Sequence, residues 1–164
     1  MKWLLISLII LLGTIKPLIA REHSGVPRVI DGNTIIINFQ HIRLHGIEAP
    51  HVEQLCEIEE ATWRCGWEAT NALAHIIGRH WVTCQEIGSS KKEVIDATCL
   101  AGNILNINAW MVRNGWATAR HQSNTQLKRL EALARQEKIG IWRVRYDNTE
   151  HLDRYKIEDA VQLR

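Results

Sequence analysis

The chain carries no excess of charge of either sign. It has 20 Lys and Arg against 18 Asp and Glu, and two of the cations, Lys2 and Lys16, lie in the first twenty residues. Without that segment the formal charges cancel. Phosphate backbones are bound by clustered Lys and Arg, so the overall charge gives no support for a basic nucleic-acid-binding protein. Any such function must rest on local groups.

No apolar run is long enough to span a bilayer, which takes about 20 residues in a helix. Lys2 is followed by the apolar run Leu4–Leu12 and then by Pro17–Ala20, which is the layout of a secretory signal peptide. We therefore expect residues 1–20 to be removed, leaving a periplasmic or extracellular protein with no stable membrane association. An uncleaved anchor is the alternative, but the short run and Lys16 count against it.

The four cysteines include no Cys-x-x-Cys pair, which disfavours a structural zinc site. An even number of cysteines in an exported chain indicates disulfides instead. Three pairings are possible. We favour Cys56–Cys65, which closes a short loop, and Cys84–Cys99, which joins two successive predicted strands.

No internal repeats or low-complexity tracts occur. The chain that remains after residue 20 is long enough for one domain with its own core, which we place at residues 21–143. Residues 144–164 are highly charged and weakly patterned, and we expect a short helix or a disordered end there.

The stretch Val29–Gln54 predicts a β-hairpin. Ile35, Ile37 and Phe39 alternate on one face of a β-branched run, and a second strand is expected over Ile42–Ile47. Polar groups lie at or near the ends of these strands, which gathers them into one candidate site. They are Asp31, Arg43, Glu48, His51 and Glu53.

The rest of the domain predicts three helices and a second hairpin. The helices are expected over Gly66–Gly78, from Asn106 to Asn114-Gly115, and from Ser123 or Asn124 to Gly140. The hairpin strands are expected over Trp81–Ile87 and Val94–Leu100. Six of the seven tryptophans lie beyond residue 20. We interpret most of them as buried; exposed platforms for stacking bases are the alternative.

Ordered motifs along the chain resemble the staphylococcal-nuclease-like, or thermonuclease, family. They are VIDGNTI, IRLHGIEAP, Gln54-x-Cys56, Cys65-Gly66, NAWMVRNGWA and Gly140-Ile141-Trp142. They cover roughly Val29 to Trp142, and the four cysteines resemble those of exported bacterial members. The resemblance implies an α+β fold, with a five-stranded OB-type barrel and three packed helices.

The same resemblance implies calcium-dependent hydrolysis of DNA and RNA phosphodiesters. The family pattern has Asp-Gly-Asp-Thr, an aspartate after Gly-Ile, a glutamate after the proline, and two arginines. Carboxylates hold the calcium ion, the glutamate lies near the attacking water, and the arginines clamp the phosphoryl oxygens.

Asp31, Asn33 and Glu48 occupy the metal-binding positions of that pattern. Asn33 replaces the second carboxylate with a neutral amide, and Glu48 replaces an aspartate with a side chain one methylene longer. Calcium prefers charged carboxylate oxygens. The resemblance thus implies a Ca²⁺ cofactor, and the substitutions predict that the ion binds weakly or not at all.

The predicted catalytic residues are Arg43, His51 and Lys92. Arg43 matches the first family arginine, and His51 replaces the glutamate, where it could accept a proton. Val94 replaces the second arginine. Lys92, two residues earlier on the same strand face, could supply a point charge but not a bidentate fork. Losing one preorganised donor to a transition-state oxyanion costs roughly two to three orders of magnitude in rate.

We therefore predict a pseudoenzyme: a thermonuclease-like domain with a degenerate hydrolytic site, which binds nucleic acid or another extended polymer with weak or no nuclease activity. The alternative is an active divalent-metal-dependent nuclease that hydrolyses DNA and RNA phosphodiesters through the substituted site.

Overall fold

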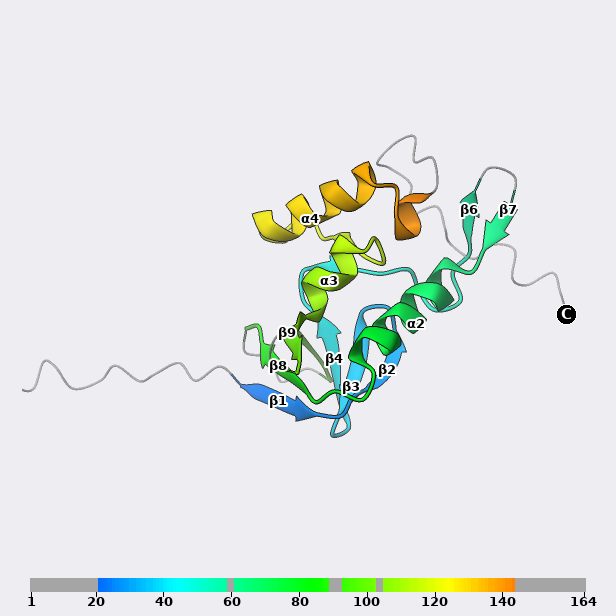
Figure 1. Cartoon of the computed structure of the whole chain (residues 1–164). Coiled ribbons are helices and arrows are strands. Elements are labelled where there is room, and N and C mark those ends of the chain that lie inside the picture. Colours follow the sequence, from blue (N-terminus) through cyan, green and yellow to red (C-terminus); the bar gives the residue numbers. More distant parts are fainter. Residues whose placement is uncertain (1–20, 59–60, 89–92, 103–104, 144–164) are drawn as a thin grey trace, which may run out of the picture.

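The β-sheet closes on itself because one segment of chain pairs at both of its ends. In the computed structural model, which describes residues 21–58, 61–88, 93–102 and 105–143, the strand order is β1-β8-β9-β4-β3-β2. β1 and β2 are consecutive in the chain, and Val26-Pro27 separates them. Proline has no N–H to donate, so a break in the ladder falls naturally there. The result is the predicted five-stranded OB-type barrel, with β1 and β2 acting as one broken strand (Figure 1).

The strands of this sheet are mostly short. They are β1 Glu22–Gly25, β2 Arg28–Asp31, β3 Thr34–Ile37, β4 Gln40–Leu44, β8 Val82–Glu86, β9 Val94–Ala101 and β10 Leu105–Asn106. β4 and β9 are parallel, and the other neighbours are antiparallel. Two small pairs lie outside the sheet. They are β5 Ile47–Glu48 with β11 Thr118–Ala119, and β6 Cys56–Ile58 with β7 Ala61–Trp63.

Alternation along β3 and β4 fills the barrel as predicted. Ile35 and Ile37 are buried. The prediction for Phe39 was wrong, because Asn38 and Phe39 form the turn between β3 and β4, both with positive φ. Positive φ at both positions is the pattern of a type I′ two-residue hairpin turn, and this turn leaves Phe39 99% exposed. The second strand also ends earlier than predicted, at Leu44.

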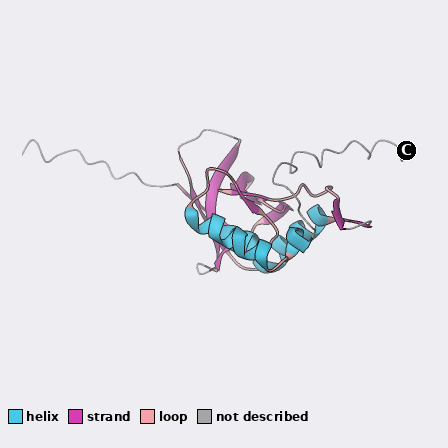
Figure 2. Ribbon diagram, turned by 90° about the horizontal axis from the view of Figure 1, so that it is seen from above, coloured by secondary structure: helices cyan, strands magenta, loops and turns pink. Residues whose placement is uncertain are grey.

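In the described residues, three α-helices gather on one side of the strands (Figure 2). They are α2 Cys65–Ile77, α3 Ile107–Arg113 and α4 Thr125–Gln136, followed by the 3-10 turn η1 Gly140–Arg143. Asn106 and Asn124 cap α3 and α4, each accepting a backbone N–H through its side chain. The predicted end of α4 at Gly140 was wrong, because the helix ends four residues earlier, at Gln136. That glycine instead lets the backbone approach Gly115, whose carbonyl a Cβ would overlap.

Both predicted disulfides are present. Cys56–Cys65 joins β6 to the start of α2, and Cys84–Cys99 joins paired positions of β8 and β9. Disulfides are typical of oxidising compartments. In the described part of the chain, no helix is long and apolar enough to cross a membrane.

The tryptophans are less buried than predicted. Trp142 is 4% exposed, whereas Trp67 and Trp81 are 48% and 57% exposed. Arginines cover several of the rings; the guanidinium carbon of Arg135 lies 4.0 Å from the Trp142 ring centre. The predicted signal peptide, the predicted tail at 144–164 and Lys92 lie outside the described residues.

Asn108 is a buried polar side chain, 2% exposed, that ties α3 to the barrel. Its side-chain oxygen accepts the N–H of Cys99, and its amide donates to the carbonyls of His45 and Ala97. Buried polar groups left without partners are costly. These bonds therefore stabilise the end of β4, from which the chain enters the rim loops.

We predict that Asn108→Ala lowers the free energy of unfolding by about 3 kcal/mol, since three backbone groups each lose a hydrogen bond and only the Ala97 carbonyl keeps another one, from the N–H of His45. Urea unfolding followed by circular dichroism measures the change. Asn71→Ala, on the exposed face of α2, is the control and should change stability by less than about 0.5 kcal/mol. Equal effects of the two substitutions would contradict the role assigned to Asn108.

Candidate functional site

The turn between β2 and β3 presents the first group of site residues. The backbone N–H of Asn33 donates to Oδ1 of Asp31 at 2.9 Å, and the Thr34 hydroxyl donates to Oδ1 of Asn33 at 3.3 Å. Gly32 packs so closely that a Cβ there would lie 2.7 Å from the Cβ of Ala49. The absence of a side chain at Gly32 thus brings Asp31 and Asn33 next to the loop that follows Glu48.

The pairing of β5 with β11 presents the second group. Thr118 lies opposite Glu48 in the register, and its hydroxyl donates to the Glu48 carbonyl at 3.3 Å. Arg120 follows directly after β11. Its backbone N–H donates to the carbonyl of Gly46, and its own carbonyl accepts the N–H of Ser123. The backbone of Arg120 is therefore fixed on both sides.

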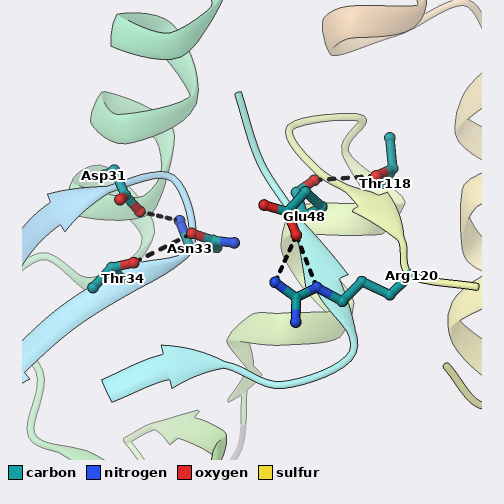
Figure 3. Close-up of polar contacts among 6 residues, drawn as sticks. All are labelled: Asp31, Asn33, Thr34, Glu48, Thr118 and Arg120. Atoms are coloured by element: carbon teal, nitrogen blue, oxygen red, sulfur yellow. Dashed lines mark hydrogen bonds and ion pairs between the residues drawn. The ribbon is translucent and has the colours of Figure 1, made fainter. Parts of the chain in front are cut away.

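Arg120 and Glu48 form an ion pair across this junction. Nε of Arg120 donates to Oε2 of Glu48 at 2.8 Å, and its Nη2 lies 2.6 Å from the same oxygen. The two side chains are 38% and 53% exposed. Figure 3 shows the pair on one side, with Asp31, Asn33 and Thr34 on the other.

Arg43 lies on β4, and its Cα pairs with Thr34 on β3 and with Asp96 on β9. The flanking residues Ile42 and Leu44 point into the core, so Arg43 points to the opposite face. It is half-buried and, among the described residues, has no carboxylate partner within ion-pair distance. Arg43 is therefore a cation available to a ligand.

His51 lies in a tight loop fixed by Gln54. The backbone N–H of His51 donates to Oε1 of Gln54, and the backbone N–H of Gln54 donates back to the His51 carbonyl. The Gln54 carbonyl accepts the N–H of Gly66 in α2. The side chain of His51 is exposed.

These groups line one cleft of about 510 Å³. Its wall is formed by Asp31, Asn33, Thr34, Arg43, Glu48, Ala49, Pro50, His51, Gln54, Thr118, Arg120 and Ile141. All the predicted site residues that the structure describes line it, except Glu53. Val94 does not line it either, but it lies on the same face of β9 as Asp96, whose Cα pairs with that of Arg43, so a longer side chain at position 94 would extend beside Arg43.

Sequence reasoning missed Arg120. No periodic pattern marks this residue, because β11 has only two residues. Its position depends on pairing with Glu48, which is 72 residues away in the chain. The motif NAWMVRNGWA ends three residues before it, and reading on past that motif to the next cation was the one available signal.

The oxygen atoms of the cleft do not fit the calcium site that the family resemblance implies. Calcium takes six to eight oxygen ligands, several of them charged. Asp31 supplies a carboxylate and Asn33 a neutral amide, while Glu48 is already held by a guanidinium. Within the described residues, no group of three or more His, Cys, Asp or Glu could hold a metal ion.

The fold and cleft define a class of protein. OB-type barrels bind oligonucleotides and oligosaccharides on the barrel face and its loops, and here a cleft with two arginines opens beside the β2–β3 turn. Residues 41–144 match the family model described as staphylococcal nuclease homologue. The chain belongs to that family.

Curated relatives support the same membership. The chain is 31% identical over 134 residues to a succinoglycan biosynthesis protein, ExoI, from Rhizobium meliloti, covering 80% of this chain and 68% of that one. It is 30% identical over 143 residues to an uncharacterized endonuclease from Escherichia coli, covering 84% and 88%. A probable staphylococcal-like nuclease, CAN4, from rice is 30% identical over 137 residues, but this chain spans only 25% of its length.

The close approach at Gly32 can be tested directly. We predict that Gly32→Ala destabilises the protein by about 1–3 kcal/mol, because the added methyl has no room, and weakens ligand binding in the cleft. Adding Ala49→Gly removes the nearest obstructing carbon and should recover part of both losses. Urea unfolding and oligonucleotide binding measure the two effects. A double variant no better than Gly32→Ala would show that the contact with Ala49 does not set the turn.

Proposed function

We propose that residues 21–143 form an exported domain that binds the phosphodiester backbone of nucleic acid in this cleft, with weak or no hydrolysis. The observation that carries the proposal is Arg43, a half-buried arginine on a rigid strand that lines the cleft without a carboxylate partner among the described residues. A guanidinium matches the geometry of phosphate oxygens and binds them through two parallel hydrogen bonds.

Family membership and the E. coli relative, whose name is uncharacterized endonuclease, support nucleic acid as the ligand. The disulfides and the signal-like first twenty residues support export. The name of ExoI refers to glycan biosynthesis, so a sugar polymer belongs in the same assay as a competing ligand.

Weak hydrolysis follows from three substitutions relative to the family pattern. Asn33 lacks the charge of a calcium-binding carboxylate, His51 replaces the glutamate near the attacking water, and Val94 cannot stabilise a phosphoryl oxygen. Each substitution removes an interaction that stabilises the transition state and that is worth roughly two to three orders of magnitude in rate, although such losses are not additive. Binding survives these changes because it does not require the transition state to be stabilised.

The first test is binding of labelled single-stranded DNA and RNA, followed by fluorescence anisotropy at low salt, where electrostatic binding is strongest. Arg43→Ala should weaken binding roughly 10- to 100-fold, because hydrogen bonds to charged groups contribute about 1.5–3 kcal/mol. Arg129→Ala, an exposed arginine on α4, is the matched control. No binding by the unaltered protein, or preference for an uncharged glycan, would refute the proposal.

The second candidate is an active metal-dependent nuclease, favoured by the presence of His51 and Arg43 in one cleft. In that case His51 would take the proton from the attacking water, and Arg43 with Lys92 would contact the phosphate. Cleavage of DNA or RNA across calcium and other divalent ions, abolished by Arg43→Ala, would establish this function and refute the degenerate site.

A restored site separates lost catalytic groups from a changed barrel face. The variant combines Asn33→Asp, Glu48→Asp, His51→Glu and Val94→Arg. We predict that it gains calcium-dependent cleavage at least about tenfold above the unaltered protein, since one preorganised donor alone is worth more than that. A folded but inactive variant would show that the barrel face itself no longer accepts the substrate.

A further inference from the structure

We propose that Arg120 is a second phosphate-binding residue of the cleft, oriented by Glu48, and that the cleft binds a phosphodiester without a divalent ion. This inference rests on the proposed function and identifies a second residue that binds the phosphate in the cleft. The phosphate group would lie between Arg43, from the barrel strand β4, and Arg120, from the end of β11. Neither the family pattern nor the motifs of the sequence assign a role to Arg120.

The first support is the way Arg120 is held. Its backbone is bonded to Gly46 and Ser123, and β11 is itself tied to α4, since the Ala119 N–H donates to Oε2 of Glu131. Even on a fixed backbone, the long side chain of Arg120 loses conformational entropy when it binds a ligand. The contact with Glu48 reduces that loss, because the guanidinium is already restrained in the free protein.

The second support is the set of donors that Glu48 leaves free. A guanidinium carries five N–H groups. Glu48 occupies Nε and one hydrogen of Nη2, both through the single oxygen Oε2. Among the described residues, Nη1 of Arg120 has no hydrogen-bond partner, and Figure 3 shows the third nitrogen of the group pointing away from Glu48. Three N–H donors thus remain for phosphate oxygens.

The third support is the charge of the cleft wall. The charged side chains that line it are Asp31, Glu48, Arg43 and Arg120, besides His51. With His51 neutral, two carboxylates balance two guanidinium groups. There is no net negative charge to attract a divalent ion, and Glu48, which would have to bind one, is engaged by a fixed cation. A phosphate that reaches the cleft finds its positive partners already present.

Salt dependence tests the proposal, because a residue that contacts phosphate changes the slope of log K against log salt, whereas a purely structural ion pair does not. For single strands the slope changes by about 0.7 for each phosphate contact. Labelled single-stranded DNA is titrated over a range of salt concentrations, in EDTA and in calcium. The variants are Arg120→Ala, Arg120→Lys and, as a matched control, Arg113→Ala.

Arg113 is a suitable control because it is 37% exposed and paired with Glu137 at 2.7 Å, yet does not line the cleft. We expect Arg120→Ala to weaken binding about tenfold at low salt and to lower the slope by about 0.7. Arg120→Lys should keep the slope with weaker binding, since the charge remains and the fork is lost. Arg113→Ala should change neither quantity, and affinity in EDTA should equal that in calcium within about twofold.

Two outcomes would overturn the inference while leaving the proposed function intact. One is binding weakened by Arg43→Ala but unchanged, in strength and slope, by Arg120→Ala. The other is affinity that appears only when calcium is added. A complete absence of binding by the unaltered protein would refute both proposals together. Urea unfolding of each variant checks that a loss of binding is not a loss of fold.

Discussion

The closure of the barrel by the segment from β1 to β2 is the constraint on which the rest of the structure depends. One end of this segment pairs with β8 and the other with β3, so the row of strands between them must curve. The curvature encloses an aliphatic core, and it leaves the β2–β3 turn at the rim. Asp31 and Asn33 thus occupy a fixed position at the barrel rim, where OB-type barrels commonly bind ligands.

The rim is completed by loops that pack on that turn rather than by further strands. Ala49 packs against the backbone of Gly32. Backbone hydrogen bonds hold the loop around His51 through Gln54, which is bonded in turn to Gly66 at the start of α2. These contacts are short-range and dense, which suits a site that must hold several polar groups in fixed positions. The disulfide Cys56–Cys65 follows this loop, and Sγ of Cys65 lies 3.5 Å from the Gln54 carbonyl oxygen, so the bridge restrains the end of the loop.

The features that could be predicted from the sequence are those encoded locally. The helical spacing of α2, the asparagine caps of α3 and α4, and the pairing of Cys84 with Cys99 all follow from residues close together in the chain. Phe39 misled the interpretation because alternation continues through the hairpin turn, and an apolar residue at positive φ is rare. The family motifs supplied the predicted site residues that line the cleft, Asp31, Asn33, Arg43, Glu48 and His51, because the motifs record the order of short runs along the chain and not their packing.

Arg120 could not be predicted in the same way, because only the contact of β11 with β5 brings it to the cleft. Two-residue strands carry no periodic signal, and their pairing is decided by the tertiary packing of α3 and α4. The motif positions, taken one at a time, therefore indicate that one of the two arginines is missing. The assembled cleft nevertheless contains two arginines, Arg43 and Arg120. A cation that lies outside the motifs, such as Arg120, does not enter a comparison with the family pattern.

The charges of the cleft argue that the substitutions form a consistent set. In the family pattern, four carboxylates face two arginines, and a divalent ion balances the excess. Here Asn33 and His51 each remove one negative charge, the arginine expected at the position of Val94 is absent, and Arg120, which lies outside the pattern, adds one positive charge. The four changes together move the cleft two units toward positive charge, to neutrality. The carboxylates and guanidinium groups of the cleft therefore balance one another without a metal ion, which is the condition that the proposed metal-independent binding of phosphate requires.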